Sequence, residues 1–298
     1  MTGDAIEQLG TWFDETFFMI GIVILLIEIA KGLFQGKLKW HGVFDMVSSA
    51  STQIPSILAE TFLLSFVYFG FVVVSDYLIP RTIPINVWTI LLALLACDFV
   101  YYWEHRLAHE IRLFWTQHAV HHSSRHMNVS VAIRFGPFEG AISALLHFPL
   151  VLIGFTAELV FFGILFVLAY QVWIHTELIG KLPVLDEFLN TPANHRVHHG
   201  CDDKYIDTNY GGILIIWDRI FGTYQREEET PRYGLKRDFN SVNPLVVWFS
   251  ELPQLYRDIR NARNWGEVWD YLFRPPGWKP QPGQDDGCYR GGSAVTGN

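Results

Sequence analysis

Three long apolar runs limit what this chain can fold into. Residues 16–34, 56–79 and 87–103 are each long enough to cross a bilayer as a helix, and they carry few charges. Half of the residues are hydrophobic and 15% are aromatic, which is unusual for a soluble enzyme of this length. We therefore predict an all-α integral membrane protein.

Two further apolar segments, 140–155 and 158–174, are each short for a full crossing. We predict a hairpin of tilted or partly inserted helices here, giving about four to five transmembrane or hairpin helices in total. We also expect a helix over 243–274. This gives three regions: an N-terminal transmembrane region (1–86), a histidine-rich core (87–240), and a C-terminal cytoplasmic helix with a Pro/Gly-rich tail (241–298).

The distribution of charge predicts how the chain crosses the membrane. The N-terminus carries acidic residues and no basic ones, whereas basic residues follow the first and third runs: Lys31, Lys37, Lys39, Arg106, Arg112, Arg125 and Arg134. Positive loops face the cytoplasm, so the N-terminus is expected outside and the segments after the third run inside. We expect a cytoplasmic helical cap on a membrane bundle.

Eight of the 12 histidines fall in three short boxes. Their offsets of three and four residues put the imidazoles on one face of a helix, one turn apart. Thr191-Pro192 is a good start for a helix carrying the third box, and Gly200 a good end. The boxes are His105 and His109; His118, His121 and His122; and His195, His198 and His199.

So many clustered imidazoles predict a metal site. Imidazole is mostly neutral near pH 7 and is the commonest protein metal ligand. Eight ligands exceed what one four- to six-coordinate ion uses, so two ions are expected. His175 is placed to join the cluster, and Asp98 either orients a ligand imidazole or is a polar group at a helix end. His147 is either structural or lines a substrate cavity.

Other site types lack their signatures. There is no HExxH pairing, no Glu-x-x-His carboxylate pair and no CxxC among three cysteines, and a net charge of −8 excludes a basic nucleic-acid surface. Neutral nitrogen ligands suit two iron ions that activate dioxygen for attack on an unreactive C–H bond, chemistry that a redox metal must carry. No flavin, haem or iron–sulfur motif is present, so the two electrons come from a donor protein or a small reductant.

The boxes and their surroundings resemble a known superfamily. The residues are His118-Ala-Val-His-His-Ser-Ser-Arg-His-Met-Asn128, the segment 171–180, Asn194-His-Arg-Val-His-His-Gly200, and the segments 205–212, 216–224 and 275–278. Over roughly 90–280 they resemble the fatty acid hydroxylase/sterol desaturase superfamily of membrane di-iron enzymes, and most closely its alkylglycerol monooxygenase-like branch.

The resemblance implies a set of metal ligands and an activity. Zinc can replace iron on purification, and His126 matches a family position as a ligand or a support. Arg125 and Met127 depart from the family pattern, which bears on the substrate. The implied ligands are His105, His109, His118, His121, His122, His175, His195, His198 and His199.

The expected function is a membrane monooxygenase that hydroxylates a lipid, whether fatty-acyl, alkyl-ether or sterol-like, with O2. The lipid would enter from the bilayer through a cavity lined by Phe135, Phe138, His147 and Trp173. Three alternatives stay open: a desaturase using the same site, a metal transporter or sensor, and a zinc-dependent hydrolase, which lacks an evident general-base carboxylate in the sequence.

Overall fold

A computed structural model describes residues 3–79 and 83–280. Within these ranges the chain is helical and its only strand-like pairings are two isolated β-bridges, so the predicted all-α fold is confirmed. The α-helices are α1 (Gly3–Phe34), α2 (Trp40–Val73), α3 (Val87–Glu110), α4 (Arg112–His118), α5 (Glu139–Leu152), α6 (Ala157–Tyr170), α7 (Pro192–His198), α8 (Ile216–Phe221), α9 (Pro244–Trp248), α10 (Leu252–Arg260) and α11 (Trp265–Phe273). A π-helix, η1 (Val74–Leu78), extends α2, and short 3-10 turns are η2 (His121–Ser123), η3 (Val129–Ile133), η4 (Gln171–Ile174) and η5 (Leu185–Glu187).

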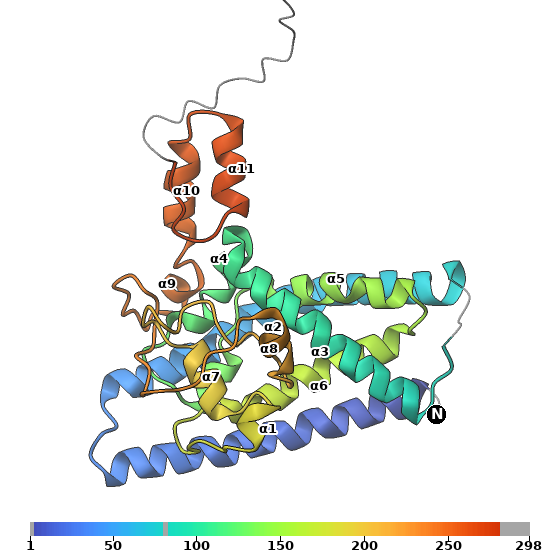
Figure 1. Cartoon of the computed structure of the whole chain (residues 1–298), viewed down its shortest axis with the longest axis horizontal. Helices are drawn as coiled ribbons and strands as arrows, with labels where there is room; N and C mark the ends of the chain where they lie inside the picture. The colour runs from blue at the N-terminus through green and yellow to red at the C-terminus, as the bar shows by residue number, and fades with distance from the viewer. Residues whose placement is uncertain (1–2, 80–82, 281–298) are drawn as a thin grey trace, which may run out of the picture.

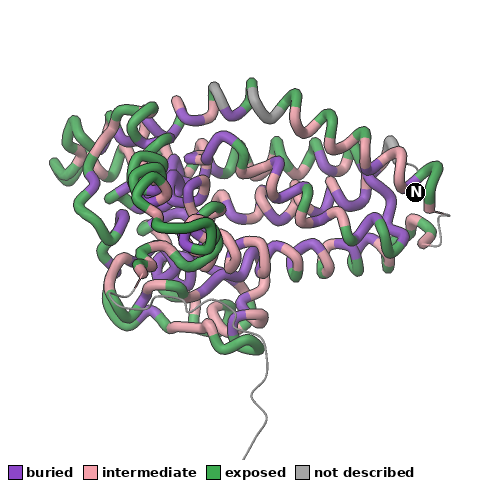
Figure 2. Tube along the Cα trace, turned by 90° about the horizontal axis from the view of Figure 1, so that it is seen from above, coloured by how far each residue is buried: buried purple, intermediate pink, exposed green. Residues whose placement is uncertain are grey.

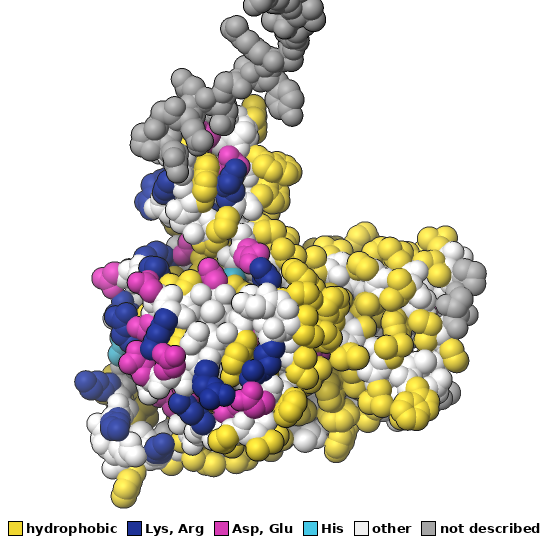
Figure 3. Space-filling model, in the orientation of Figure 1, with side chains coloured by type: hydrophobic (Ala, Val, Ile, Leu, Met, Phe, Trp, Pro, Cys, Tyr) yellow, Lys and Arg dark blue, Asp and Glu magenta, His cyan; other side chains and the backbone are white. Residues whose placement is uncertain are grey.

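The long helices form a membrane-spanning bundle. Four segments are long and apolar enough to cross a bilayer: Ala5–Phe34, Thr61–Leu78, Val87–Glu110 and Ala157–Ile174. They run along nearly one direction in Figure 1, and Figure 2 shows their outward sides exposed and their inward sides buried. In Figure 3 one end of this bundle is almost wholly apolar, whereas charged residues cover the other end. The three predicted spans are thus confirmed.

The helix α3 carries the membrane span directly into the first histidine box. Asn86 caps its start by accepting hydrogen bonds from the amides of Trp88 and Thr89, while the Thr89 hydroxyl accepts one from the Asn86 amide. No break interrupts the helix before Glu110. The span itself therefore fixes the position of these histidines along the bundle.

The predicted hairpin at 140–174 is formed by α5 and α6. The expectation that both segments are short for a full crossing is wrong for the second, because Ala157–Ile174 is long and apolar enough to cross a bilayer. Gly154, at φ +106°, turns the chain between them, and the Thr156 side chain caps α6. The turn sends the chain back to the end of the bundle where the histidines lie, as Figure 1 shows. The core lies between α1, α3 and α6. At Gly163 a Cβ atom would lie 2.4 Å from the Cys97 sulfur, so only glycine lets α6 approach α3 this closely.

The prediction of a single helix at 243–274 is wrong. Three short helices, α9, α10 and α11, replace it. Pro244 and Pro253 lie in the first turns of α9 and α10, where the missing amide costs nothing, whereas inside one long helix Pro253 would break the hydrogen-bond ladder. Asn264 then caps α11 by accepting from the Glu267 amide. Most of the predicted Pro/Gly-rich tail, residues 281–298, lies outside the described residues.

The division of the chain at residues 86 and 240 stays a prediction. The N-terminal helices pack along the core, with α1 against α6 and α2 against α5. Glu28, the charge inside the first apolar run, accepts hydrogen bonds from the Thr176 hydroxyl and the Val129 amide. A half-buried carboxylate thus joins α1 to the segments around the histidines.

Candidate metal centre

The three histidine boxes have different local structures. His105 and His109 lie one turn apart on α3, as predicted. The second box is not on one helix, which corrects the prediction: α4 ends at His118, and the chain turns before the 3-10 helix η2 presents His121 and His122. The third box lies on α7 and on the residue that follows it, and Thr191-Pro192 starts this helix as expected.

Nine buried histidines converge in two groups, and they are the nine named from the sequence. Within each group the candidate ligand atoms all lie within 4.8 Å of one another. The five-histidine group is His105, His109, His118, His122 and His198; the four-histidine group is His121, His175, His195 and His199.

In each HxxHH box, the spacing of the histidines matches the group to which each one belongs. Residues four apart share a group, as His118 and His122 do, and also His195 and His199. The histidine between them, His121 or His198, belongs to the other group. Each HxxHH box therefore supplies ligands to both groups, and the adjacent histidines of each doublet point to different ones.

Hydrogen bonds on the outer ring nitrogens fix which nitrogen faces inward. The Nδ1 atoms of His105, His198 and His175 lie 2.9, 3.0 and 2.7 Å from the carbonyl oxygens of Tyr210, Thr208 and Gln171. A carbonyl only accepts, so each Nδ1 carries the proton, and in the neutral ring Nε2 holds a lone pair. Burial lowers the pKa of His175 to about 4 and of His198 to about 3, which keeps both rings neutral at pH 7.

The inward nitrogens fit metal ligation and fit hydrogen bonding poorly. His118 donates from Nδ1 to Glu139 at 2.6 Å, so in the neutral ring its Nε2 turns a lone pair toward the Nε2 of His105 across 3.0 Å. The Nε2 atoms of His109 and His198 are buried with no hydrogen-bond partner. Two imidazoles on one ion, each at about 2.0–2.1 Å from it, have their nitrogens about 3 Å apart, which matches these separations. The donor set thus suits a cation at each group.

One loop supplies two of the outer carbonyls. Asp218 accepts from the amides of Tyr210 and Gly211 at 2.7 and 2.8 Å, and this holds the Tyr210 carbonyl against His105. Asn209, at φ +58°, is buried and donates its side-chain amide to two carbonyls. At Gly212 a Cβ atom would lie 2.7 Å from the Tyr101 ring. The segment 205–212 carried only a family likeness in the sequence; its role in orienting ligands was missed, because carbonyl contacts leave no side-chain signature.

Asp98 plays neither of the roles considered for it. It is buried in α3, and its carboxylate accepts from the Ile213 amide at 2.6 Å, the Leu214 amide at 3.2 Å and the Trp217 indole at 2.9 Å. No histidine contact is among its hydrogen bonds. Asp98 instead fixes the same loop to the membrane helix, so it acts on His105 only through Tyr210.

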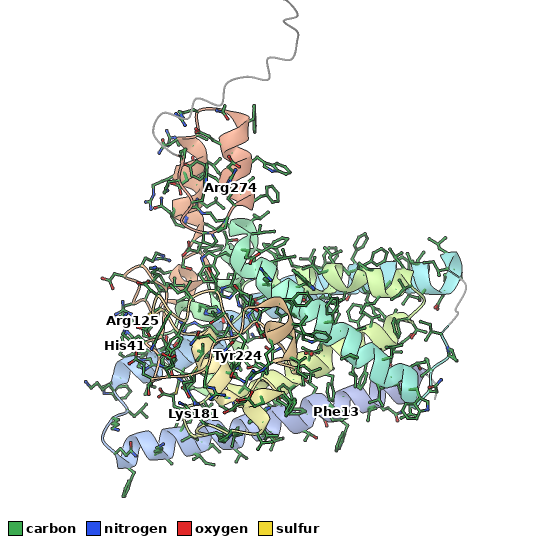
Figure 4. All side chains as sticks on the ribbon, in the orientation of Figure 1. Phe13, His41, Arg125, Lys181, Tyr224 and Arg274 are labelled. Atoms are coloured by element: carbon green, nitrogen blue, oxygen red, sulfur yellow. The ribbon has the colours of Figure 1, made fainter. Side chains whose placement is uncertain are left out.

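The remaining candidates lie apart from the two groups. His126 is exposed, with its ring 5.9 Å from that of His41, and Figure 4 shows His41 and Arg125 at the charged end of the molecule. His147 is buried with its ring nitrogens 2.8 and 3.2 Å from the carbonyls of Ser143 and Cys97, which is the structural role. Arg125 pairs with Asp238 on the surface.

A mostly apolar cavity reaches both groups. It contacts His105 and His118 of one group and His121 and His175 of the other. Of the four lining residues predicted, Phe135 is confirmed; Phe138 is exposed, His147 is buried in helix contacts, and Trp173 packs on Tyr170, so none of these three lines it. The other walls come from α3, α4, η3, α5, α6 and η4: Tyr101, Glu104, Ala108, Phe114, Gln117, Ala132, Glu139, Gly140, Ile142, Ser143, Leu168 and Gln171.

Two carboxylates, those of Glu104 and Glu139, line this cavity. No general-base carboxylate was evident from the sequence alone. Glu139 uses one oxygen to accept from His118 and the other to accept from the Gly136 amide, so it orients a ligand. Glu104 accepts from the Ser143 hydroxyl at 2.9 Å. A second cavity, on the polar side, reaches His109, His122, His198 and His199.

Comparison with known proteins agrees with this geometry. Residues 90–223, which hold every histidine of the two groups, match the family described as fatty acid hydroxylase. This segment is a fatty acid hydroxylase domain. The predicted resemblance is thereby confirmed, and the matched part runs from the membrane helix α3 to the loop that orients the ligands.

Several curated relatives are similar along most of the chain. Alkylglycerol monooxygenase of Homo sapiens is 36% identical over 273 residues, which is 89% of this chain and 59% of that protein. The Danio rerio protein of that name is also 36% identical, over 92% of this chain and 61% of its own. Ornithine lipid hydroxylase OlsE of Rhizobium tropici is 36% identical over 137 residues, 45% of this chain and 41% of that one. The chain thus spans about three fifths of the Homo sapiens and Danio rerio proteins, and no solved structure matches it.

Replacing Asp98 by Ala should destabilise the loop 205–217. The substitution leaves two amides and an indole N–H buried without an acceptor, each at about 1–3 kcal/mol. We expect a clearly lower unfolding midpoint in detergent and faster proteolysis within this loop. Asp203→Ala is the control, because Asp203 is exposed and pairs only with Lys236 at the surface. Equal midpoints for the two variants would contradict the anchoring role.

Proposed function

We propose that this protein is a membrane-bound di-iron monooxygenase that hydroxylates a lipid C–H bond with O2 and two electrons. The observation that carries the proposal is the pair of buried histidine groups that share one mostly apolar cavity. The relatives' names, monooxygenases and a hydroxylase of lipids, support the reaction class. The five-histidine group would hold one iron and the four-histidine group the other.

Two bound iron ions would supply the dioxygen activation that an unreactive C–H bond requires. The chain's own residues set the conditions for that chemistry. Carbonyls and Glu139 hold the ligand rings in place through their Nδ1 protons. Burial keeps water from the ligands, and the wall formed by residues such as Phe135, Ile142 and Leu168 presents an apolar surface to the substrate.

A lipid substrate follows from where the cavity lies. Its walls include α3, α5 and α6, which belong to the membrane bundle, so a lipid chain can pass from the bilayer to the site with little loss of apolar burial. Moving the same chain through water would cost about 0.8 kcal/mol for each exposed CH2 group. We infer that fatty-acyl, alkyl-ether or sterol-like chains enter laterally and that the reacting carbon lies near a head group.

The competing functions find less support. A transport path needs polar ligands along the membrane, whereas these histidines gather at one end of the bundle. A hydrolase is not favoured by the relatives' names, which are those of monooxygenases and a lipid hydroxylase, and of the two carboxylates in the cavity wall Glu139 has both oxygens engaged. A desaturase is the nearest alternative, because a Delta(7)-sterol 5(6)-desaturase of Aspergillus fumigatus is 28% identical over 43% of the chain. The reaction product distinguishes it.

We place the histidine end on the cytoplasmic side, following the positive-inside prediction. Arg125 and Lys181 lie at this end in Figure 4. The second cavity opens on the polar side and reaches histidines of both groups, so a donor protein or small reductant can approach there while lipid occupies the first cavity. This separation of the two routes suits a reaction that needs both partners.

The assignment of one metal ion to each histidine group predicts that each ion can be removed separately by mutation. Wild-type protein should hold about two ions, and the pairs His105→Ala/His109→Ala and His175→Ala/His195→Ala should each leave about one, because each pair removes ligands from one group only. Metal content per chain, by mass spectrometry after iron or zinc loading, measures this. The control pair His41→Ala/His126→Ala should keep both ions. Full metal content in either cluster variant, or loss in the control, would refute the assignment.

The activity predicts labelled oxygen in lipid. Membranes that contain the protein, supplied with 18-O2 and analysed by lipid mass spectrometry, should gain one labelled oxygen on a lipid chain. Ile142→Trp places a larger side chain in the cavity wall, and such overpacking costs about 1–3 kcal/mol. The amount of labelled lipid should therefore fall roughly tenfold, while the metal content stays unchanged. Leu145→Trp on the exposed side of the same helix is the matched control.

The outcomes separate the alternatives. A new double bond without label indicates a desaturase, and oxygen taken from water indicates a hydrolase. Label confined to water-soluble metabolites would refute lipid as the substrate.

Sidedness is tested by cysteine labelling from either side of sealed vesicles. Cysteines placed at Lys37 and Arg125, which are exposed, and at the C-terminus should all be labelled from the cytoplasmic side. One at Arg81, outside the described residues, should be labelled from the opposite side. Labelling of position 125 from the side opposite the cytoplasm would overturn the orientation.

A further inference from the structure

The helices α10 and α11 form a hairpin that stands out from the bundle. We call residues 252–273 the C-terminal hairpin. In Figure 1 its two helices run across the direction of the spans, beside α4 and next to the charged end. Each helix has nine residues, far too few to cross a bilayer. The hairpin lies outside the histidine groups and is unexplained by the proposed reaction.

Buried contacts fix how the hairpin sits on the body. Arg112, at the start of α4, donates to Asp258 at 2.5 Å, and its guanidinium lies 5.8 Å from the centre of the Tyr271 ring. Lys279 donates to the same Asp258 at 2.6 Å, and the Arg112 amide donates to the carbonyl of Arg274 at 3.1 Å. The hairpin is therefore a clamped element with a defined outer face.

The outer face of α11 is an aromatic stripe. Trp265, Trp269 and Phe273 recur every four residues, and the first two are 86% and 64% exposed. Glu267 and Tyr271, two positions on from each tryptophan, face inward and are buried. On α10, Tyr256 is also 64% exposed. Large exposed aromatics on a rigid support indicate a surface that is covered in the working protein.

The direction of this face identifies what covers it. In Figure 3 the hydrophobic side chains of the hairpin lie on the flank turned toward the apolar half of the bundle, and charged ones lie on the opposite flank. A bilayer around that apolar half would end at the level of the hairpin. Tryptophan and tyrosine favour this boundary, where a ring meets lipid and its N–H or O–H meets water.

The charge of the segment points to the same partner. Residues 252–280 contain five basic and three acidic residues, although the whole chain has a net charge of −8. All three acidic side chains, Asp258, Glu267 and Asp270, pair with basic ones. The local excess of positive charge suits anionic lipid head groups.

We propose that the C-terminal hairpin is an interfacial anchor: it lies in the head-group layer on the histidine side of the membrane, with Trp265, Trp269 and Phe273 among the lipid chains. This binding fixes the depth of α4, and with it the second histidine box, relative to the bilayer. The proposal depends on the membrane-spanning fold and not on the proposed reaction, so the two can fail separately.

Spin-label accessibility tests the anchor in the full chain, loaded with zinc, in nanodiscs that contain phosphatidylcholine and phosphatidylglycerol. In a Cys201→Ser/Cys288→Ser background, labels are placed at Trp269→Cys and at Arg257→Cys. Arg257 is the control because it is exposed and donates to Gln254, which faces the polar cavity. Oxygen concentrates in lipid, whereas a nickel chelate stays in water.

We expect the ratio of oxygen to nickel accessibility to be several-fold higher at position 269 than at 257. Phe273→Cys, one turn further along α11, should behave like position 269 and serves if Trp269→Cys folds poorly; two bound zinc ions report correct folding. Equal nickel accessibility at 269 and 257 would place the hairpin in water and overturn the proposal. Protection of 269 from both reagents would also overturn it, since protein and not lipid would then cover the stripe.

Discussion

The structure depends on bringing nine buried imidazoles to two points at one end of a membrane bundle. Lone pairs that face each other, as those of His105 and His118 do across 3.0 Å, are unfavourable without a cation between them. Their positions are held from outside by hydrogen bonds on the opposite ring nitrogen. The packing of the long helices therefore holds the candidate ligands in fixed orientations.

The supporting contacts link the membrane helices to the polar end. Asp98 lies within the span α3 and accepts three hydrogen bonds from the loop 205–217, whose Tyr210 carbonyl holds His105 of the same helix. Glu28 of α1 similarly joins the segments that carry His175 and η3. Each of these carboxylates accepts hydrogen bonds from more than one donor, which offsets its desolvation. The contacts of Asp98 and Glu28, which lie in the membrane spans, thus fix where the histidine groups lie along the bundle.

Two cavities reach the histidine groups from different sides. One lies against α5 and α6 and is mostly apolar, whereas the other lies at the polar end beneath the segment that leads to the C-terminal hairpin. Each reaches histidines from both groups. In the proposed function, a bilayer substrate would reach the histidines through the first cavity and a source of electrons through the second, and an anchored hairpin would keep that arrangement aligned with the membrane surface.

The sequence alone determined the spans, the hairpin at 140–174 and all nine clustered histidines, because apolar length and histidine spacing are local properties. Local spacing could not assign His121 and His198 to the opposite group from their neighbours, since that depends on where α4 ends and how η2 turns. It also placed 243–274 in one helix, although Pro253 and the Asn264 cap divide it. The role of Asp98 and the cavity walls were decided only in the tertiary structure, because they join residues far apart in the chain, such as Asp98 and Ile213, or Tyr101 and His175 of the cavity wall.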